Sequence, residues 1–462
     1  MRENILASFA RCGVGILEHE DPALHAILDR EYQRQSESLT LVAASSMADP
    51  SVLACEGTVI SNVTTEGYPG ARFHAGCVHA DEIEQLAVDR AKRVFQARYV
   101  NVQPHSGTSA NEIVLFSLLK PDDTLLGLAL DCGGHLSHGA KVSVSGRYFN
   151  AIEYRLDQAG LIDYDQVADL ARRRRPKLII CGASAYPRII DFKRFRQIAD
   201  ETGAYLLADI SHIAGLVAAG QHPSPIDHAH FTTTSMYKQL YGPRGGLILM
   251  GKDFDAPAPN QKGTLSELIQ QALFPFFQGT PNLGAVAAKA RALALIARPQ
   301  FKEVARRIVD DAKALAERFI EHGYRVLTGG TDNHLILIDV FQRGITGAAA
   351  ERALEECNII INKNKIPGDQ LPPAITSGIR LGTNSVALRG MGECEMKQCA
   401  ELMQHVLSAL AASNGADRGL SPSGKQMIRA KVAQLCRSFP VPSYPIYADR
   451  SQSIGEGAAS LF

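Results

Sequence analysis

Along the first 290 residues, short apolar runs alternate with segments whose apolar residues recur at helical spacing, and this pattern predicts alternating strands and helices. One apolar stripe at helical spacing lies within residues 81–97, at Ile83, Leu86, Ala87 and Val94. Three short apolar runs bounded by turn-forming residues predict buried parallel strands: 177–181, 205–208 and 246–250. Strands that alternate with helices in this way indicate an α/β fold.

The pattern changes after about residue 290. Helical spacing over 299–323 and 392–411, with a strand pattern over 334–340, predicts an α+β domain. A polar linker over 413–425 leads to a last amphipathic helix and a Pro-rich tail at 439–447. We therefore predict four parts: an N-terminal arm and helix (1–50), a large domain (51–290), a C-terminal α+β domain (291–412), and a linker, helix and tail (413–462).

Composition narrows the class of protein. The 462 residues hold 48 Lys plus Arg and 48 Asp plus Glu, which argues against a nucleic-acid-binding surface spread over the whole chain. Apolar runs fall short of the ~18 residues that span a bilayer. Charges at Arg2, Glu3 and Arg11 interrupt any signal peptide, so we expect a soluble cytoplasmic protein that binds neither nucleic acid nor membrane.

The nine cysteines are scattered and form no Cys-x-x-Cys pair. This spacing disfavours a disulfide framework or a thiolate zinc site, and Cys181 within an apolar run is expected in the core. The pair His135 and His138 has the spacing of a metal pair, but neither a third ligand nor a His-Glu-x-x-His frame accompanies it. We therefore predict no metal site.

Three features together suggest pyridoxal phosphate (PLP) chemistry. Lys238 lies before a Gly-rich turn, and a Ser- and Gly-rich loop at 105–111 opens a helical pattern. Backbone N–H groups at a helix start, with the hydroxyls of Ser106 and Thr108, can hold a phosphate. Asp209 follows a predicted strand, where an acid can keep a pyridine nitrogen protonated. Each feature alone is weak, since lone lysines are usually solvated and Ser/Gly turns cap many helices.

The chain resembles the serine hydroxymethyltransferases, in register from about residue 41 to 410. Seven motifs in order carry the resemblance: EGYPGARF (66–73), QPHSGTSAN (103–111), GGHLSHG (133–139), ADISHIAGLVAAG (208–220), YKQLYGPRGG (237–246), GGTDNHL (329–335) and TSGIRLGT (376–383). The resemblance implies a PLP-dependent transferase of fold type I, with a mixed, mostly parallel sheet in the large domain and a smaller C-terminal α+β domain. It also implies a homodimer, or a dimer of dimers, with active sites shared between subunits.

The resemblance assigns roles position by position. Lys238 would be the Schiff-base lysine, Asp209 the partner of the ring nitrogen, and His135 the residue stacked on the ring. The remaining cofactor contacts would be Ser106, Gly107 and Thr108 at the phosphate, Ser184 and His212 near the 3′-oxygen, and Gly279 from the neighbouring subunit. Arg380 would pair with the substrate carboxylate, a task suited to a planar guanidinium, and Glu66 of the neighbour would manage protons at the hydroxymethyl group.

Residues that match the family's folate contacts also persist, which favours tetrahydrofolate as the one-carbon acceptor. They are Glu66, Phe73, Leu130, Gly133, Gly134, Leu136, Phe274 and Asn364.

Five departures from the family pattern concern the substrate. A serine that assists carboxylate binding is Ala44, a tyrosine two residues before Glu66 is Thr64, and the histidine before the lysine is Tyr237. Paired tyrosines become Phe73 and His74, and a Gly-rich run becomes FFQGT (276–280).

Thr64 and His74 would open volume near the substrate α-carbon, as in α-methylserine hydroxymethyltransferases, which share this pattern. We therefore expect both residues to bind substrate and to act in catalysis, with α-methylserine favoured over serine. Neutral drift within an ordinary serine enzyme is the alternative reading. A folate-independent aldolase or L-threonine transaldolase, and a non-catalytic PLP-fold binding protein, are the competing functions.

Overall fold

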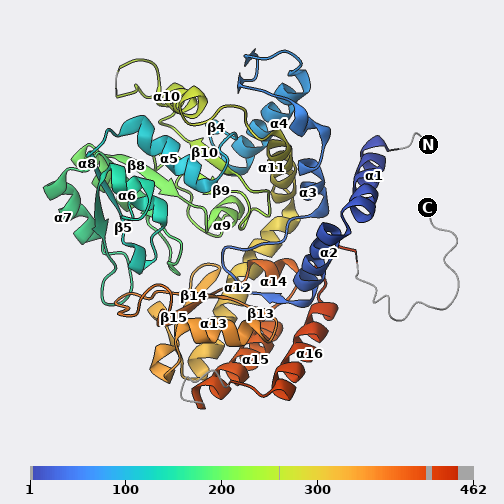
Figure 1. Ribbon diagram of the computed structural model, residues 1–462. Helices are drawn as coiled ribbons and strands as arrows, with labels where there is room; N and C mark the ends of the chain where they lie inside the picture. The colour runs from blue at the N-terminus through green and yellow to red at the C-terminus, as the bar shows by residue number, and fades with distance from the viewer. Residues whose placement is uncertain (1–3, 260, 413–418, 446–462) are drawn as a thin grey trace.

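A seven-stranded mixed sheet forms the centre of the large domain in the computed structural model, which describes residues 4–259, 261–412 and 419–445 (Figure 1). In spatial order its strands are β4 (Tyr99–Asn101), β10 (Gly246–Met250), β9 (Phe231–Ser235), β8 (Tyr205–Asp209), β7 (Leu178–Gly182), β5 (Thr124–Leu128) and β6 (Asn150–Tyr154). The strands from β9 to β6 are parallel, so the prediction of a mostly parallel sheet is confirmed.

The prediction that 246–250 forms a parallel strand is wrong. Strand β10 runs antiparallel to both β9 and β4. Only residues 236–245 connect β9 to β10, and they fold back on themselves, with the N–H of Met236 donating to the carbonyl of Gly245. A parallel strand needs a longer crossover, usually through a helix, and this connection has none.

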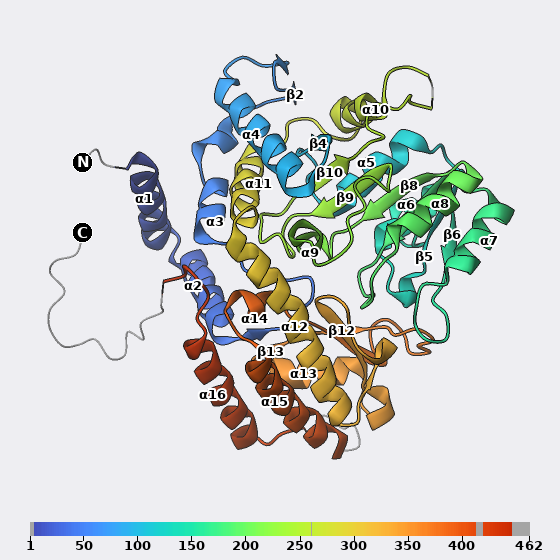
Figure 2. The same ribbon diagram turned by 180° about the vertical axis from the view of Figure 1, so that it is seen from behind.

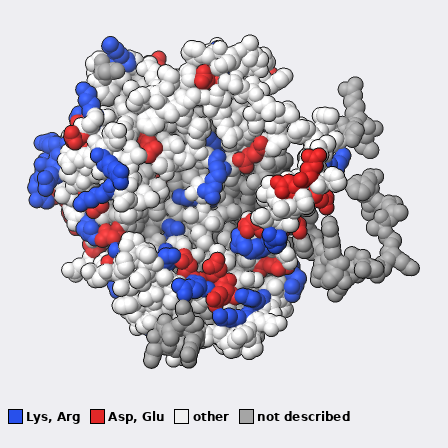
Figure 3. Space-filling view, viewed as in Figure 1, with Lys and Arg blue, Asp and Glu red and all other residues white. Residues whose placement is uncertain are grey.

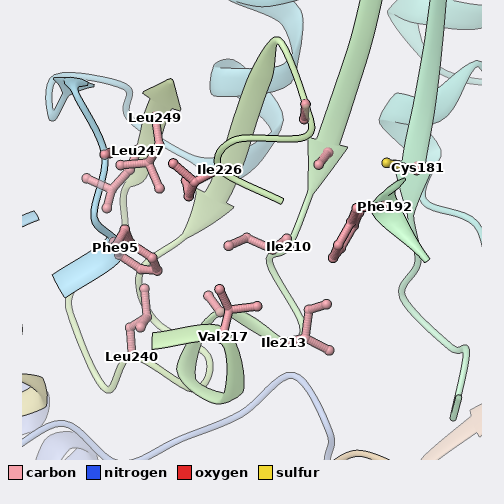
Figure 4. Packing of buried hydrophobic residues seen from close by; sticks show 14 of the residues in the cluster. Phe95, Cys181, Phe192, Ile210, Ile213, Val217, Ile226, Leu240, Leu247 and Leu249 are labelled. Atoms are coloured by element: carbon pink, nitrogen blue, oxygen red, sulfur yellow. The ribbon is translucent and has the colours of Figure 1, made fainter. Parts of the chain in front are cut away.

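Helices cover both faces of the sheet. Alternate residues of β7 separate the two apolar clusters, with Ile179 and Cys181 in one and Leu178 and Ile180 in the other. The first cluster is formed with α4 (Val78–Phe95), α7 (Tyr164–Arg174), α8 (Phe192–Thr202), α9 (Ala214–Ala219) and α11 (Leu283–Ile296), and the second with α5 (Gly107–Leu118) and α10 (Leu265–Gln271). Figure 4 shows Cys181 among the apolar side chains of the first cluster, where it is fully buried as predicted.

A second, smaller unit follows α12 (Pro299–Glu321), which runs from the large domain into it (Figure 2). Its antiparallel sheet contains β11 (Arg325–Val326), β12 (Leu335–Asp339), β15 (Gly378–Gly382) and β14 (Asn362–Asn364). Helices α13 (Gly347–Glu355), α15 (Glu393–Ala412) and α16 (Pro422–Ser438) contribute to its core. Near the N-terminus, β1 (Leu39–Thr40) pairs with β13 (Ile359–Ile360) and so belongs to the same core.

The predicted C-terminal helices are confirmed, but the linker was predicted too long. Helix α16 begins at Pro422, and the Ser421 hydroxyl caps it by accepting from the N–H of Gly424. Serine at the N-cap and proline at the first helical position are strong helix-start signals, although the segment is also rich in turn formers. Of the tail, the residues up to 445 lie in the described part, where Tyr444 stacks on Tyr32; residues 446–462 lie outside it.

The N-terminal helices α1 (Ile5–Glu20) and α2 (Pro22–Glu37) stand at the edge of the molecule in both views (Figures 1 and 2). Neither has a buried residue, and α1 exposes large apolar side chains: Ile5, Leu6, Phe9, Val14 and Ile16. Among the described helices, none is long and apolar enough to cross a membrane. On the face drawn in Figure 3, basic and acidic side chains are interspersed.

The remaining α-helices and strands of the described residues are α3 (Pro50–Glu56), α6 (Val144–Tyr148), α14 (Asn384–Leu388) and the hairpin of β2 (Gly67–Tyr68) with β3 (Ala71–Arg72).

One carboxyl group in α12 is buried without a partner. Asp311 is 0% exposed, and within the described residues neither of its side-chain oxygens has a hydrogen bond. Burial raises the pKa of Asp311 to about 8, and Arg307 opposes the rise only in part. The folded protein therefore holds a proton on Asp311 at neutral pH, where the unfolded chain does not.

Replacing Asp311 with Asn should remove the loss of folding stability that ionisation of this buried carboxyl group causes as the pH rises. A pKa higher in the folded than in the unfolded state means that the parent protein loses stability as the pH rises from about 4 to about 8. Relative to the parent, Asp311→Asn should gain up to about 1.4 kcal/mol of unfolding free energy per pH unit in that window. Urea unfolding at several pH values measures the difference. The control is Asp310→Asn, which removes a carboxylate that pairs with Arg306 on the same helix; an equal gain there would contradict the prediction.

Candidate active site

A cavity of ≈ 140 Å³ lies at the carboxyl ends of β7, β8 and β9, where open α/β sheets bind their ligands. It brings together eight predicted residues: Ser106, Gly107, Thr108, His135, Ser184, Asp209, His212 and Lys238. Arg380 on β15 joins them, because its Nη1 donates to the Ser184 carbonyl at 2.6 Å. A larger cleft of ≈ 770 Å³, at the ends of α4, α9 and α11, contains none of the predicted residues.

One end of the cavity suits a phosphate group. Helix α5 begins there, and the Ser106 hydroxyl caps it by accepting from the N–H of Ser109 at 2.9 Å. A side chain at Gly107 would lie 3.2 Å from Ser235 Cβ and 3.3 Å from Ser211 Oγ, so glycine lets the helix start approach β9 closely. The Ser235 hydroxyl is buried and has no hydrogen-bond partner among the described residues. A helix N-terminus beside an unsatisfied hydroxyl is a favourable anion site.

Another part of the cavity wall is built around the carboxylate of Asp209, which is 7% exposed at the end of β8. His138 Nε2 and Asn111 Nδ2 donate to its Oδ2 at 3.0 and 2.8 Å, and the N–H of Ser211 donates to Oδ1 at 2.9 Å. Burial alone would raise the pKa of Asp209, but the hydrogen bonds from His138 and Ser211 outweigh burial and hold it well below its ordinary value. The carboxylate therefore stays ionised and can hold a proton on a ring nitrogen.

His138 and Asn111 were not assigned roles from the sequence. Both lie in motifs that mark the family resemblance, and His138 follows His135 by three residues. Their common partner is Asp209, which is 71 residues from one and 98 from the other along the chain, so no local pattern could reveal the contact.

His135 lies beside this network as a neutral ring. Its Nδ1 contacts the Ser137 hydroxyl at 2.7 Å, and burial lowers its pKa to about 4. A neutral imidazole at the wall of the cavity is suited to stacking on a protonated aromatic ring. His135, His138 and Asp209 also present atoms within 4.8 Å of one another, close enough to hold a metal ion. Because two of the three are already joined by a hydrogen bond, we retain the ring-binding interpretation.

Lys238 is 6% exposed and follows β9. Burial lowers its pKa to about 8; Asp209 opposes this change, and Arg380 and Arg244 add to it. A lysine with a lowered pKa has a larger fraction of neutral amine, which is the form that attacks an aldehyde. The residue before it, Tyr237, stacks against the Arg244 guanidinium at 3.8 Å from the ring centre.

Arg380 and His334 lie beside the cavity, in contact with Ser184 and His212, which line it. Nε of Arg380 donates to Asn362 at 3.1 Å and Nη1 to Ser184, which fixes the plane of the guanidinium. His212 and His334 stack with ring centres 5.6 Å apart, and burial lowers the pKa of His334 to about 3. No role was predicted for His334 from the sequence, although it lies in the motif GGTDNHL.

Six predicted residues do not line this cavity and form a cluster of their own, which we call the Glu66 cluster: Thr64, Glu66, Phe73, His74, Phe274 and Gly279. A side chain at Gly279 would lie 3.2 Å from Glu66 Oε1, and the rings of Phe73 and Phe274 are 5.4 Å apart. The Cys77 thiol donates to the backbone carbonyls of both Thr64 and His74, so these two positions are neighbours.

The other predicted folate residues lie on loops near His135 and on β14. Leu130 and Leu136 are 43% and 47% exposed, and Asn364 lies on β14. Packing requires glycine at positions 133 and 134. A side chain at Gly133 would lie 2.4 Å from the Ala185 carbonyl oxygen, and one at Gly134 would lie 2.0 Å from that of Leu128. These glycines alone therefore say little about folate.

Comparison with known proteins gives the family directly. The profile of the family described as serine hydroxymethyltransferase matches residues 17–403. A protein named serine hydroxymethyltransferase from Zymomonas mobilis is 47% identical over 426 residues, which is 92% of this chain and 96% of that protein. Proteins of the same name from Halorhodospira halophila and Chromohalobacter salexigens are each 46% identical over 421 residues, 91% of this chain and 97% of theirs. The chain belongs to the serine hydroxymethyltransferase family.

Proposed function

We propose that this hydroxymethyltransferase prefers α-methylserine to serine as the donor of the one-carbon unit. The hydroxymethyltransferase activity itself follows from the family, whose members bind PLP and use tetrahydrofolate as co-substrate. The residues of the cavity fit PLP. The start of α5 and the unpaired Ser235 hydroxyl suit the phosphate, the ionised Asp209 suits the ring nitrogen, and Lys238 suits the aldehyde. When bound, PLP withdraws electrons from the bonds at the substrate α-carbon, which weakens the bond to the hydroxymethyl group.

The side chains of the cavity bind and orient the amino acid. Arg380 receives the carboxylate, because its guanidinium is held in plane by Asn362 and Ser184 while Nη2 makes no hydrogen bond among the described residues. Asp209 keeps the ring nitrogen protonated, and His135 supports the ring from one side. Glu66 of the partner subunit takes the proton from the substrate hydroxyl, so that the carbon–carbon bond can break.

The preference for α-methylserine rests on the position of Thr64 beside Glu66. A threonine occupies the place where the family pattern has a tyrosine, and His74 replaces a second tyrosine next to it in space. The volume freed by a missing ring can accept a methyl group in place of the α-hydrogen. Cleavage of the bond between the α-carbon and the hydroxymethyl carbon requires loss of the hydroxyl proton but no α-hydrogen. The added methyl group therefore does not block the reaction.

A homodimer with shared active sites explains the separation of the Glu66 cluster from the cavity. Within one chain, the residue proposed to move the substrate proton does not line the cavity that contains Lys238. A second copy bound through the exposed apolar side of α1 would cover Ile5, Leu6 and Phe9, which are 77%, 58% and 50% exposed. Such a copy can bring its own Glu66 cluster to the cavity of the first.

The donor is tested with purified, PLP-loaded protein on L-serine, α-methyl-L-serine and L-threonine, each with and without tetrahydrofolate. We expect folate-dependent turnover of α-methylserine, with kcat/KM at least about tenfold above that for serine. Equal or better use of serine would overturn the preference while leaving the family activity intact. Folate-independent release of acetaldehyde from threonine would indicate a transaldolase or aldolase instead.

Thr64→Tyr should reverse the preference. A tyrosine ring would fill the space assigned to the α-methyl group, so kcat/KM for α-methylserine should fall relative to serine by about 10- to 100-fold. The matched control is Thr58→Tyr, at a position outside the Glu66 cluster and the cavity. An unchanged ratio of the two kcat/KM values in Thr64→Tyr would contradict the pocket argument.

Mixing two inactive variants tests the shared site. Lys238→Ala and Glu66→Gln homodimers should each be inactive, but a hybrid dimer contains one site with both native residues. Random exchange of subunits makes half of the dimers hybrid, so about a quarter of the wild-type activity should return. If Glu66 instead acts within its own subunit, every hybrid site lacks one residue and no activity returns.

A further inference from the structure

Lys289 of α11 is a buried cation that the proposed reaction does not use. It is 2% exposed, and its Nζ donates three hydrogen bonds to backbone carbonyls: Val102 at 2.6 Å, Pro104 at 3.0 Å and Gly246 at 3.0 Å. Within the described residues it forms no ion pair, and the buried acid Glu84 instead pairs with Arg72 at 2.7 Å. Burial lowers the pKa of Lys289 to about 7, against the opposing charge of Glu84.

Burying an ammonium group is costly unless each of its protons has an acceptor. Here all three protons are satisfied, and each acceptor lies next to the phosphate end of the cavity. Val102 and Pro104 immediately precede the loop that contains Ser106, and Gly246 begins β10. The N–H of Gly246 also donates to the Pro104 carbonyl at 2.9 Å, so the ammonium fixes two segments that already pair.

The ammonium also lies directly behind the cavity wall. Gly245 lines the cavity together with Ser106, Gly107 and Thr108. A side chain built on Gly245 would come within 2.8 Å of Lys289 Nζ, so the ammonium packs against a glycine that forms part of the cavity wall.

The segment that contains Lys289 holds the same loop at a second point. Gln278, just before α11, accepts from the N–H of His105 at 3.2 Å and donates to the Gln103 carbonyl at 3.1 Å. The backbone from Val102 to His105 is therefore fixed from one side by residues 278–289, immediately before the start of α5.

We propose that Lys289 is a positioning residue for the cofactor phosphate, which it stabilises without touching it. It orders the loop before Ser106, and its protonated form places a positive charge behind the phosphate. The proposal rests on the assignment of the phosphate to Ser106, Gly107 and Thr108. A purely structural lysine would tie α11 to the sheet but would not distinguish ligands with a phosphate from those without one.

The test compares two ligands of the full-length apoprotein, PLP and pyridoxal, which differ only in the phosphate. Dissociation constants are measured by absorption or fluorescence titration for the parent, Lys289→Met and the control Lys302→Met, which removes an exposed lysine of α12. Lys289→Met should raise the dissociation constant of PLP about tenfold and that of pyridoxal less than about twofold, because the lost charge acts on the phosphate alone. Lys302→Met should leave both values unchanged.

The outcomes separate the alternatives. A parallel loss of affinity for both ligands, or no loss for either, would overturn the positioning role while leaving the proposed function in place. If Lys289→Met does not fold, as judged by the thermal melting of the apoprotein, Lys289→Gln is measured in the same way, since its amide can still donate to two of the carbonyls. A parent protein that binds PLP no better than pyridoxal would instead refute the phosphate assignment, and with it the proposal for Lys289.

Discussion

The buried carboxylate of Asp209 is the constraint to which the rest of the site is fitted. Its hydrogen bonds reach Asn111 on α5 and His138 in the turn after His135, and Asn111 in turn accepts from Thr233 on β9. One ionised group therefore fixes helix α5, whose start is the proposed phosphate site, the loop that presents His135, and the strand that leads to Lys238. Removing its partners would leave an unpaired charge in the core, so these elements cannot shift independently.

Much of this arrangement could be predicted from the sequence because local patterns determine it. The apolar runs at 177–181 and 205–208 correspond to β7 and β8, and the end of β8 placed Asp209 at the ligand-binding edge of the sheet. Seven of the eight predicted residues around the cavity lie in the motifs of the family resemblance, and Ser184 lies outside them. Local spacing could not give the direction of β10, because an apolar run reads the same in either orientation and only its short connection to β9 determines the pairing.

The contacts that sequence reasoning missed are long-range ones between polar residues. His138, Asn111 and Lys289 are each ordinary within their own helix or turn, and their importance arises from partners about 70 to 190 residues away. Lys289 shows this clearly, because within α11 it follows a run of alanines and nothing nearby in the sequence suggests that its ammonium faces three carbonyls. Buried polar networks are defined by the fold as a whole and have no periodicity of their own.

The difference between exposed residues and residues of the buried polar network explains where this chain departs from its family. Thr64 and His74 are exposed in the single chain, and Cys77 contacts only their backbone carbonyls, so the fold depends little on which side chains occupy these positions. Residues tied to Asp209 have no such freedom, since each satisfies a buried polar group. We therefore expect substitutions that alter the accepted donor in the Glu66 cluster, which under the proposed function meets substrate in the neighbouring subunit, while the groups around Asp209 stay fixed. Under the proposed function, specificity can change without loss of stability, because the residues proposed to select the substrate are not those that satisfy buried polar groups.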